Sequence, residues 1–152
     1  MQKTLKILAF SLLVLNLYSC LGTLPVRPRN NNSVIYIHRA DAALLGRSDY
    51  AAFYLNGIEI TRLTEPDTYK AVHTTPGFYR IQYKMFTQKD ELIKVFTWES
   101  SVEPNQEYLS GVGYTFGWQC LSKFVSPWRT KITSARNAGE ADATKLVKPQ
   151  KQ

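Results

Sequence analysis

The sequence has few of the side chains that build metal centres and nucleophilic sites. Its 152 residues include two cysteines, Cys20 and Cys120, and two histidines, His38 and His73. It has no His-x-His, His-Glu-x-x-His or Cys-x-x-Cys spacing, and a zinc site needs convergent ligands of this kind. We therefore expect no metal and no cofactor. Each histidine is expected to be a surface or strand-end residue.

Clustered charge is also missing. The net charge is +7, but no block of five or more like charges occurs, so a nucleic-acid partner is not indicated. The acidic residues are scattered, without the spacing of a calcium loop or a sign of paired catalytic carboxylates. Gly111-Val112-Gly113 lacks the lysine and the further glycine of a phosphate-binding loop. These absences favour a protein that is not an enzyme.

The sequence begins with an apolar run that is too short to cross a membrane. Met1–Lys6 is basic, and Ile7–Leu17 is mostly apolar. A basic start followed by about 7–15 apolar residues is typical of a signal peptide, whereas a membrane-spanning helix needs about 20. We expect residues 1–19 to be a cleaved leader. An uncleaved anchor helix that continues through Leu24 is the alternative.

Leu17-Tyr18-Ser19-Cys20 resembles the lipobox of bacterial lipoproteins. Leu17 and Ser19 fit the motif, although Tyr18 is bulkier than the usual residue. The resemblance implies cleavage before Cys20 and fatty acyl chains, such as palmitate, on this cysteine. Two or more chains hold a protein firmly at a membrane. Because Leu21 rather than aspartate follows the cysteine, the resemblance favours the outer membrane over the inner one.

The segment after the cysteine predicts a flexible tether. Residues 20–33 contain two prolines and the run Asn30–Asn32, which offers no apolar face to bury. If Cys20 is acylated, Cys120 is a lone thiol, and we expect it to be buried. An intermolecular disulfide or a reactive thiol is the alternative. A disulfide between Cys20 and Cys120 would require that lipidation does not occur.

Residues 34–134 show the alternation and turn signals of a β-domain. Asn56-Gly57 predicts a tight hairpin, and the apolar residues on both faces of Leu92–Val102 predict a central strand. An antiparallel β-sandwich of about seven or eight strands is expected. Residues 135–152 are expected to be a polar tail, with a short helix as an option. The expected strands are Val34–His38, Ala51–Leu55, Ile58–Leu63, Thr68–Thr74, Phe78–Phe86, Leu92–Val102 and Glu107–Thr115, with weaker candidates at Cys120–Val125 and Trp128–Thr133.

The order of these turns and strands resembles a family of bacterial lipoproteins, the domain of unknown function 2846 family. The resemblance covers roughly residues 33–146 and includes Tyr54-Leu55-Asn56-Gly57, Pro76-Gly77-Phe78-Tyr79 and Glu103-Pro104-Asn105-Gln106-Glu107-Tyr108. That family is similar to the carboxypeptidase-regulatory, transthyretin-like and PEGA-type sandwiches. The resemblance implies a sandwich fold and carries over no catalytic residue, and fold alone does not give a function.

One aromatic-rich segment remains without an assigned role. Its aromatic residues could close one end of the core, which is the commoner use, or form a partner or membrane contact. We expect a lipid-anchored envelope protein that acts as a binding or scaffolding module, with membrane contact through Cys20 and an envelope protein as partner. A sheet edge or this segment would make the contact. An envelope thiol hydrolase using Cys120 and a purely structural component are the alternatives. The aromatic residues are Phe116, Trp118, Phe124 and Trp128.

Overall fold

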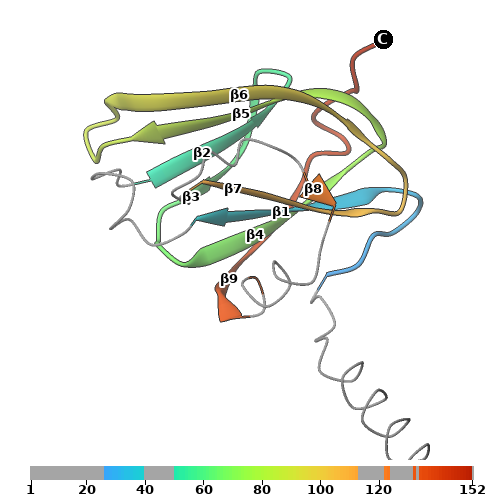
Figure 1. The fold of residues 1–152 in the computed structure, drawn as a ribbon, viewed down its shortest axis with the longest axis horizontal. Coiled ribbons are helices and arrows are strands. Elements are labelled where there is room, and N and C mark those ends of the chain that lie inside the picture. Colours follow the sequence, from blue (N-terminus) through green and yellow to red (C-terminus); the bar gives the residue numbers. More distant parts are fainter. Residues whose placement is uncertain (1–25, 40–49, 113–121, 124–131, 133, 152) are drawn as a thin grey trace, which may run out of the picture.

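The chain folds into a two-layer β-sandwich, as expected from its sequence (Figure 1). A computed structural model describes residues 26–39, 50–112, 122–123, 132 and 134–151. One sheet has the order β8-β7-β1-β4-β9 and the other the order β3-β2-β5-β6. The strands are β1 (Ser33–Arg39), β2 (Tyr50–Leu55), β3 (Ile58–Leu63), β4 (Thr68–Thr74), β5 (Gly77–Phe86), β6 (Leu92–Val102), β7 (Glu107–Val112), β8 (Ser122–Lys123) and β9 (Arg136–Asp142).

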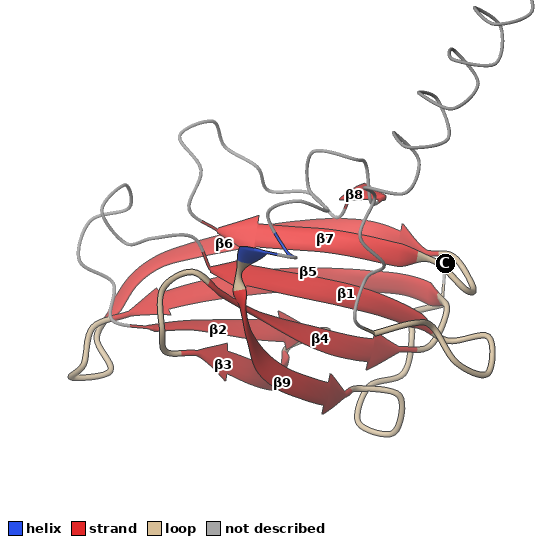
Figure 2. Ribbon diagram, turned by 90° about the horizontal axis from the view of Figure 1, so that it is seen from below, coloured by secondary structure: helices blue, strands red, loops and turns tan. Residues whose placement is uncertain are grey.

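The sandwich is not purely antiparallel, because two pairs in the larger sheet are parallel. β1 runs parallel to β7, and β4 runs parallel to β9 (Figure 2). Parallel neighbours need a long connection, and here each pair is separated by other strands of the sandwich. The local alternation of residues predicts a strand but not the direction of its neighbour, so only the three-dimensional structure reveals these pairs.

The hairpin between β2 and β3 forms where Asn56-Gly57 predicted it. Asn56 has a φ of 50° and Gly57 a φ of 83°, the left-handed conformations that a two-residue hairpin needs. The Asn56 side chain also accepts a 2.8 Å hydrogen bond from the Arg80 amide and donates one of 2.8 Å to the Lys148 carbonyl. The turn therefore connects β5 and the C-terminal segment as well as its own two strands.

The main core lies between the two sheets. The predicted alternation along β5 is confirmed, since Tyr79, Ile81, Tyr83 and Met85 are at most 2% exposed. Burying a large apolar side chain contributes about 1.5–3 kcal/mol, so this row is a major source of stability. The Tyr83 hydroxyl donates a 3.0 Å hydrogen bond to the carbonyl of Ser110 and so links the two sheets.

β6 lies at a sheet edge rather than at the centre, so this prediction was wrong. It pairs with β5, and no other described strand borders it. Its inward-facing Phe96 and Trp98 pack against the core, which accounts for one apolar face. Val102, at the end of the strand, is also buried in the core, whereas Leu92, Ile93 and Val95 are exposed, at 54%, 47% and 41%.

The C-terminal segment is a structural part of the domain rather than a free tail or helix. β9 extends the larger sheet, and the following Ala143 and Val147 are buried in the main core. The Gln150 amide donates a 2.8 Å hydrogen bond to the carbonyl of Phe78. Among the weaker strand candidates, β8 falls within Cys120–Val125, whereas Ile132, inside Trp128–Thr133, is helical.

A smaller core covers the outer face of the larger sheet. The central strand β1 is buried along its whole length, so both of its faces are covered. Val26, at the start of the described chain, is 5% exposed and belongs to this outer core. The described part of the predicted tether therefore contacts the domain. The members of the outer core are Val26, Val34, Tyr36, Tyr69, Ala71, Leu109, Ile132 and Ala135.

Candidate functional site, a polar groove at the ends of β4 and β9

Most of the side chains that the sequence singled out lie outside the described residues. These are Cys20, Phe116, Trp118, Cys120, Phe124 and Trp128. Both histidines lie next to the last residue of their strands, as expected. His38 is buried rather than on the surface, and its Nε2 lies 3.4 Å from Oδ1 of Asp67. His73 is half-buried, and its Nε2 lies 2.9 Å from Oε2 of Glu140.

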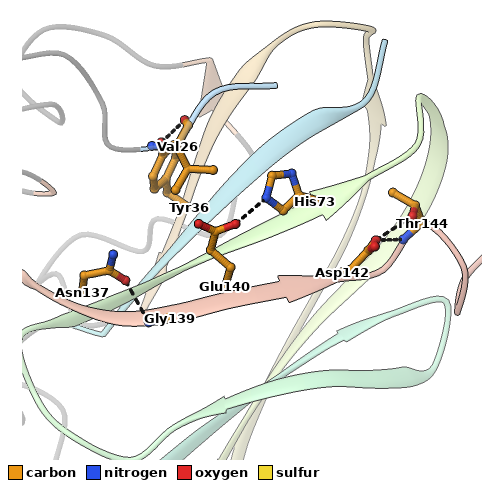
Figure 3. Close-up of polar contacts among 8 residues, drawn as sticks. All are labelled: Val26, Tyr36, His73, Asn137, Gly139, Glu140, Asp142 and Thr144. Atoms are coloured by element: carbon orange, nitrogen blue, oxygen red, sulfur yellow. Dashed lines mark hydrogen bonds and ion pairs between the residues drawn. The ribbon is translucent and has the colours of Figure 1, made fainter. Parts of the chain in front are cut away.

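His73 belongs to a groove at the carboxyl ends of β4 and β9. The groove has a volume of about 360 Å³ and is walled on one side by the turn that leads into β1. The close-up view shows His73 and Glu140 pointing toward one another across the two strands (Figure 3). The charged and polar side chains that line the groove include Arg29, Asn30, Asn32, His73, Glu140 and Asp142.

A bulge in β9 places the two carboxylates on the groove side. Thr68 and Tyr69 pair with Arg136 and Asn137, but Ala71 pairs with Glu140, so β9 has one extra residue. Because side chains alternate along a strand, one extra residue moves all later side chains to the opposite face. Glu140 and Asp142 thus share the outer face with His73. Without the bulge they would point toward the core.

Local hydrogen bonds stabilise the bulge. Gly139 has a φ of 109°, which a side chain would disfavour, and its amide donates a 2.8 Å hydrogen bond to Oδ1 of Asn137. This contact appears in Figure 3. The sequence Asn137-Ala138-Gly139 is therefore the local cause of the change in register.

A second turn orients Asp142 at the end of β9. Its Oδ1 accepts hydrogen bonds from the Thr144 amide, at 2.9 Å, and from the Thr144 hydroxyl, at 2.6 Å (Figure 3). These two bonds stabilise the carboxylate and lower the pKa of Asp142, with a smaller contribution from nearby His73. Asp142 is therefore ionised in the groove at neutral pH.

The opposite wall of the groove is a tight asparagine turn. Asn30 and Asn31 adopt φ values of 52° and 63°, and the Asn32 amide donates a 2.9 Å hydrogen bond to the carbonyl of Arg29. Asparagine accepts this left-handed conformation more readily than most residues. The turn places Asn30 and Asn32 in the lining of the same groove as Glu140 and Asp142.

The arrangement suits recognition of a polar ligand. Carboxylate oxygens accept hydrogen bonds, asparagine amides donate and accept, and Arg29 supplies a cation. Within the described residues, no three His, Cys, Asp or Glu side chains form a group that could hold a metal ion. The groove can therefore contact hydroxyl and amide groups with several donors and acceptors at once.

Sequence inspection missed Glu140 and Asp142 because their segment was assigned to a polar tail. Two local signals could have indicated otherwise. Asn-x-Gly and Asp-x-Thr both favour turns in which a side chain bonds the backbone two residues later. Such turns at residues 137–139 and 142–144 enclose a short segment that can form a strand.

No family model, no curated protein and no solved structure matches this chain. Among the described residues, no helix is long and apolar enough to cross a membrane.

Proposed function

We propose that this protein is a lipid-anchored component of a bacterial envelope, and that its β-sandwich is a non-catalytic binding module. The observation that carries the proposal is the motif Leu17-Tyr18-Ser19-Cys20. Its cysteine stands six residues before Val26, the first residue that the structure describes, which is buried in the domain. A basic, apolar leader precedes the motif, as in secreted lipoproteins. The resemblance of residues 33–146 to the domain of unknown function 2846 family agrees with this role and stays a prediction.

The short connection keeps the domain close to the lipid surface. Six residues span at most about 20 Å when extended, and Val26 is hydrogen-bonded to Tyr36 in β1. Arg29, Asn30 and Asn32, which form one wall of the groove, follow directly. The groove would therefore lie near the membrane, where it can contact polar groups of an envelope glycan or protein. The outer membrane is the favoured location because Leu21 follows the cysteine.

The anchor is tested by intact mass and cell fractionation of the wild type and a Cys20→Ser variant in a bacterial host. The wild type should lack Met1–Ser19, carry acyl chains and remain with the membranes. The variant should be released or uncleaved. A wild-type protein with an unmodified Cys20 would remove the basis of the proposal.

The edge strand β6 supports a second way of binding a protein partner. An exposed edge can accept an extended segment as an additional strand. Leu92, Ile93 and Val95 are exposed along β6 and would contact such a segment. This observation favours strand addition at β6 as the second candidate.

Photo-crosslinking in intact cells separates the two binding modes. A photoreactive residue at Asn30 reports on the groove, one at Val95 reports on β6, and one at Lys89, exposed in the turn between β5 and β6, is the control. Crosslinks at Asn30 alone would assign binding to the groove, and crosslinks at Val95 alone to the edge. If neither exceeds the Lys89 control, the domain is not a binding module.

A further inference from the structure

A second hollow lies at the amino-terminal ends of β4 and β9, where β3 also contacts both strands. Its volume is about 280 Å³. Three cationic side chains and one carboxylate line it, together with polar groups of the surrounding turns. We propose that this cavity binds a phosphate group. The lining includes Arg62, Lys70, Arg136, Glu65, Thr64 and Asn137.

The positive charge of the cavity is not fully matched within the protein. Arg62 bonds Glu59 through Nε at 2.6 Å and through Nη2 at 3.3 Å, and Arg136 pairs with Glu65. In the part of the chain that the structure describes, the Lys70 ammonium has only the neutral Thr61 hydroxyl as a partner, at 3.0 Å. Two carboxylates therefore face three cations, and the charge of Lys70 attracts an anion.

The two arginines can turn toward a ligand if they give up exposed contacts, which for Arg62 include the Tyr50 ring, 5.1 Å from its Cζ. The side chain of Arg62 is 50% exposed and that of Arg136 is 66% exposed. Exposed ion pairs contribute little to stability because water competes for both partners. An anion in the cavity can replace part of these contacts. The side chain of Lys70, on β4, is half-buried, so its movement away from the cavity is restricted.

The set of donors suits phosphate in particular. A guanidinium group presents paired N–H groups that match two phosphate oxygens, and an ammonium group adds a point charge. The three cations come from β3, β4 and β9, so several oxygens of a tetrahedral anion can be contacted together. The Asn137 oxygen already accepts the Gly139 amide, which leaves its amide nitrogen to donate.

The test is calorimetric titration of the full-length protein in neutral detergent micelles with inorganic phosphate, at constant ionic strength. The Lys70→Gln variant should bind phosphate at least about tenfold more weakly, because a charge-assisted hydrogen bond is lost. Lys89→Gln removes the same charge from an exposed turn and should bind like the wild type. Equal affinities for Lys70→Gln and Lys89→Gln, or no binding by the wild type, would overturn the proposal.

A second titration identifies the source of the phosphate group. Glycerol 3-phosphate carries a phosphate on an organic headgroup, and inorganic phosphate does not. Tighter binding of glycerol 3-phosphate that Lys70→Gln weakens indicates a phosphorylated organic ligand. Tighter binding of inorganic phosphate, again weakened by Lys70→Gln, indicates the free ion. A Lys70→Arg variant, which keeps the charge, should retain binding, and its thermal unfolding checks that the fold is intact.

Discussion

The hydroxyl group of Tyr36 binds both backbone polar groups of Val26. It accepts a hydrogen bond of 3.1 Å from the Val26 amide and donates one to the Val26 carbonyl (Figure 3). Tyr36 is buried in the central strand β1, and Val26 lies ten residues earlier in the chain. This single side chain fixes the point at which the chain enters the domain.

Replacing Tyr36 with phenylalanine should release this entry point. The change leaves a buried amide and carbonyl without a partner, so we expect the free energy of unfolding in urea to fall by about 2 kcal/mol. Trypsin should also cleave faster after Arg29, three residues beyond Val26. Tyr54→Phe, which removes one half-buried hydrogen bond to Glu59, is the matched control and should cost about 1 kcal/mol or less. Equal losses and unchanged cleavage in the two variants would show that Tyr36 does not fix Val26.

Stability should fall above pH 10 because two tyrosines are protected from ionisation. Burial raises the pKa values of Tyr36 and Tyr83 above the ordinary value of 10.0. Their contribution is complete below pH 10 and is lost as pH rises toward the folded-state values, since the unfolded chain releases these protons first. Between its unfolded-state and folded-state pKa values, each tyrosine should lower the free energy of unfolding by about 1.4 kcal/mol per pH unit. Denaturation at several alkaline pH values should show a smaller slope in Tyr83→Phe, and an unchanged slope would contradict this account.

The contact between Gly77 and Pro149 should make Gly77→Ala strongly destabilising. Gly77 has a φ of 146°, and a Cβ atom there would lie 2.2 Å from Cβ of Pro149. The backbone strain and the clash together should cost more than about 2 kcal/mol in thermal or urea unfolding. Pro149→Gly removes the clash but not the strain, so the double variant should regain part of the loss. Strictly additive effects would show that the two residues do not interact.

The turn at Asp142 should contribute stability that is lost in acid. The folded-state pKa of Asp142 is lowered, so its contribution is present above the ordinary value of 3.8 and is lost as pH falls through the folded-state pKa. Asp142→Asn should therefore unfold more easily than the wild type at pH 6, with the difference shrinking toward pH 2. Glu99→Gln, on exposed β6, is the control and should match the wild type at both pH values. A difference that is constant with pH would mean that the carboxylate charge is not involved.

The sequence by itself determined β1 to β7 and most of their ends, whereas β9 was not predicted. Alternation along residues 77–86 and the pair Asn56-Gly57 act over a few residues, so they can be recognised without a partner. The short apolar leader and the motif ending in Cys20 are likewise local, and they carry the proposal of a lipid anchor. These features depend on the chemistry of neighbouring residues along one chain.

Only the tertiary structure decided which strands are neighbours and where polar side chains meet. β1 and β6 are both rich in apolar residues, yet β1 is the central strand of its sheet and β6 lies at an edge. The position of a strand in a sheet depends on segments that are distant in the sequence. The groove joins Arg29 with His73 and Asp142, and the basic cavity joins Arg62 with Lys70 and Arg136. Both sites require the parallel pairing of β9 with β4, and the groove also requires the one-residue bulge in β9. The physical reason is that sheet pairing is a long-range choice among strands with similar local patterns.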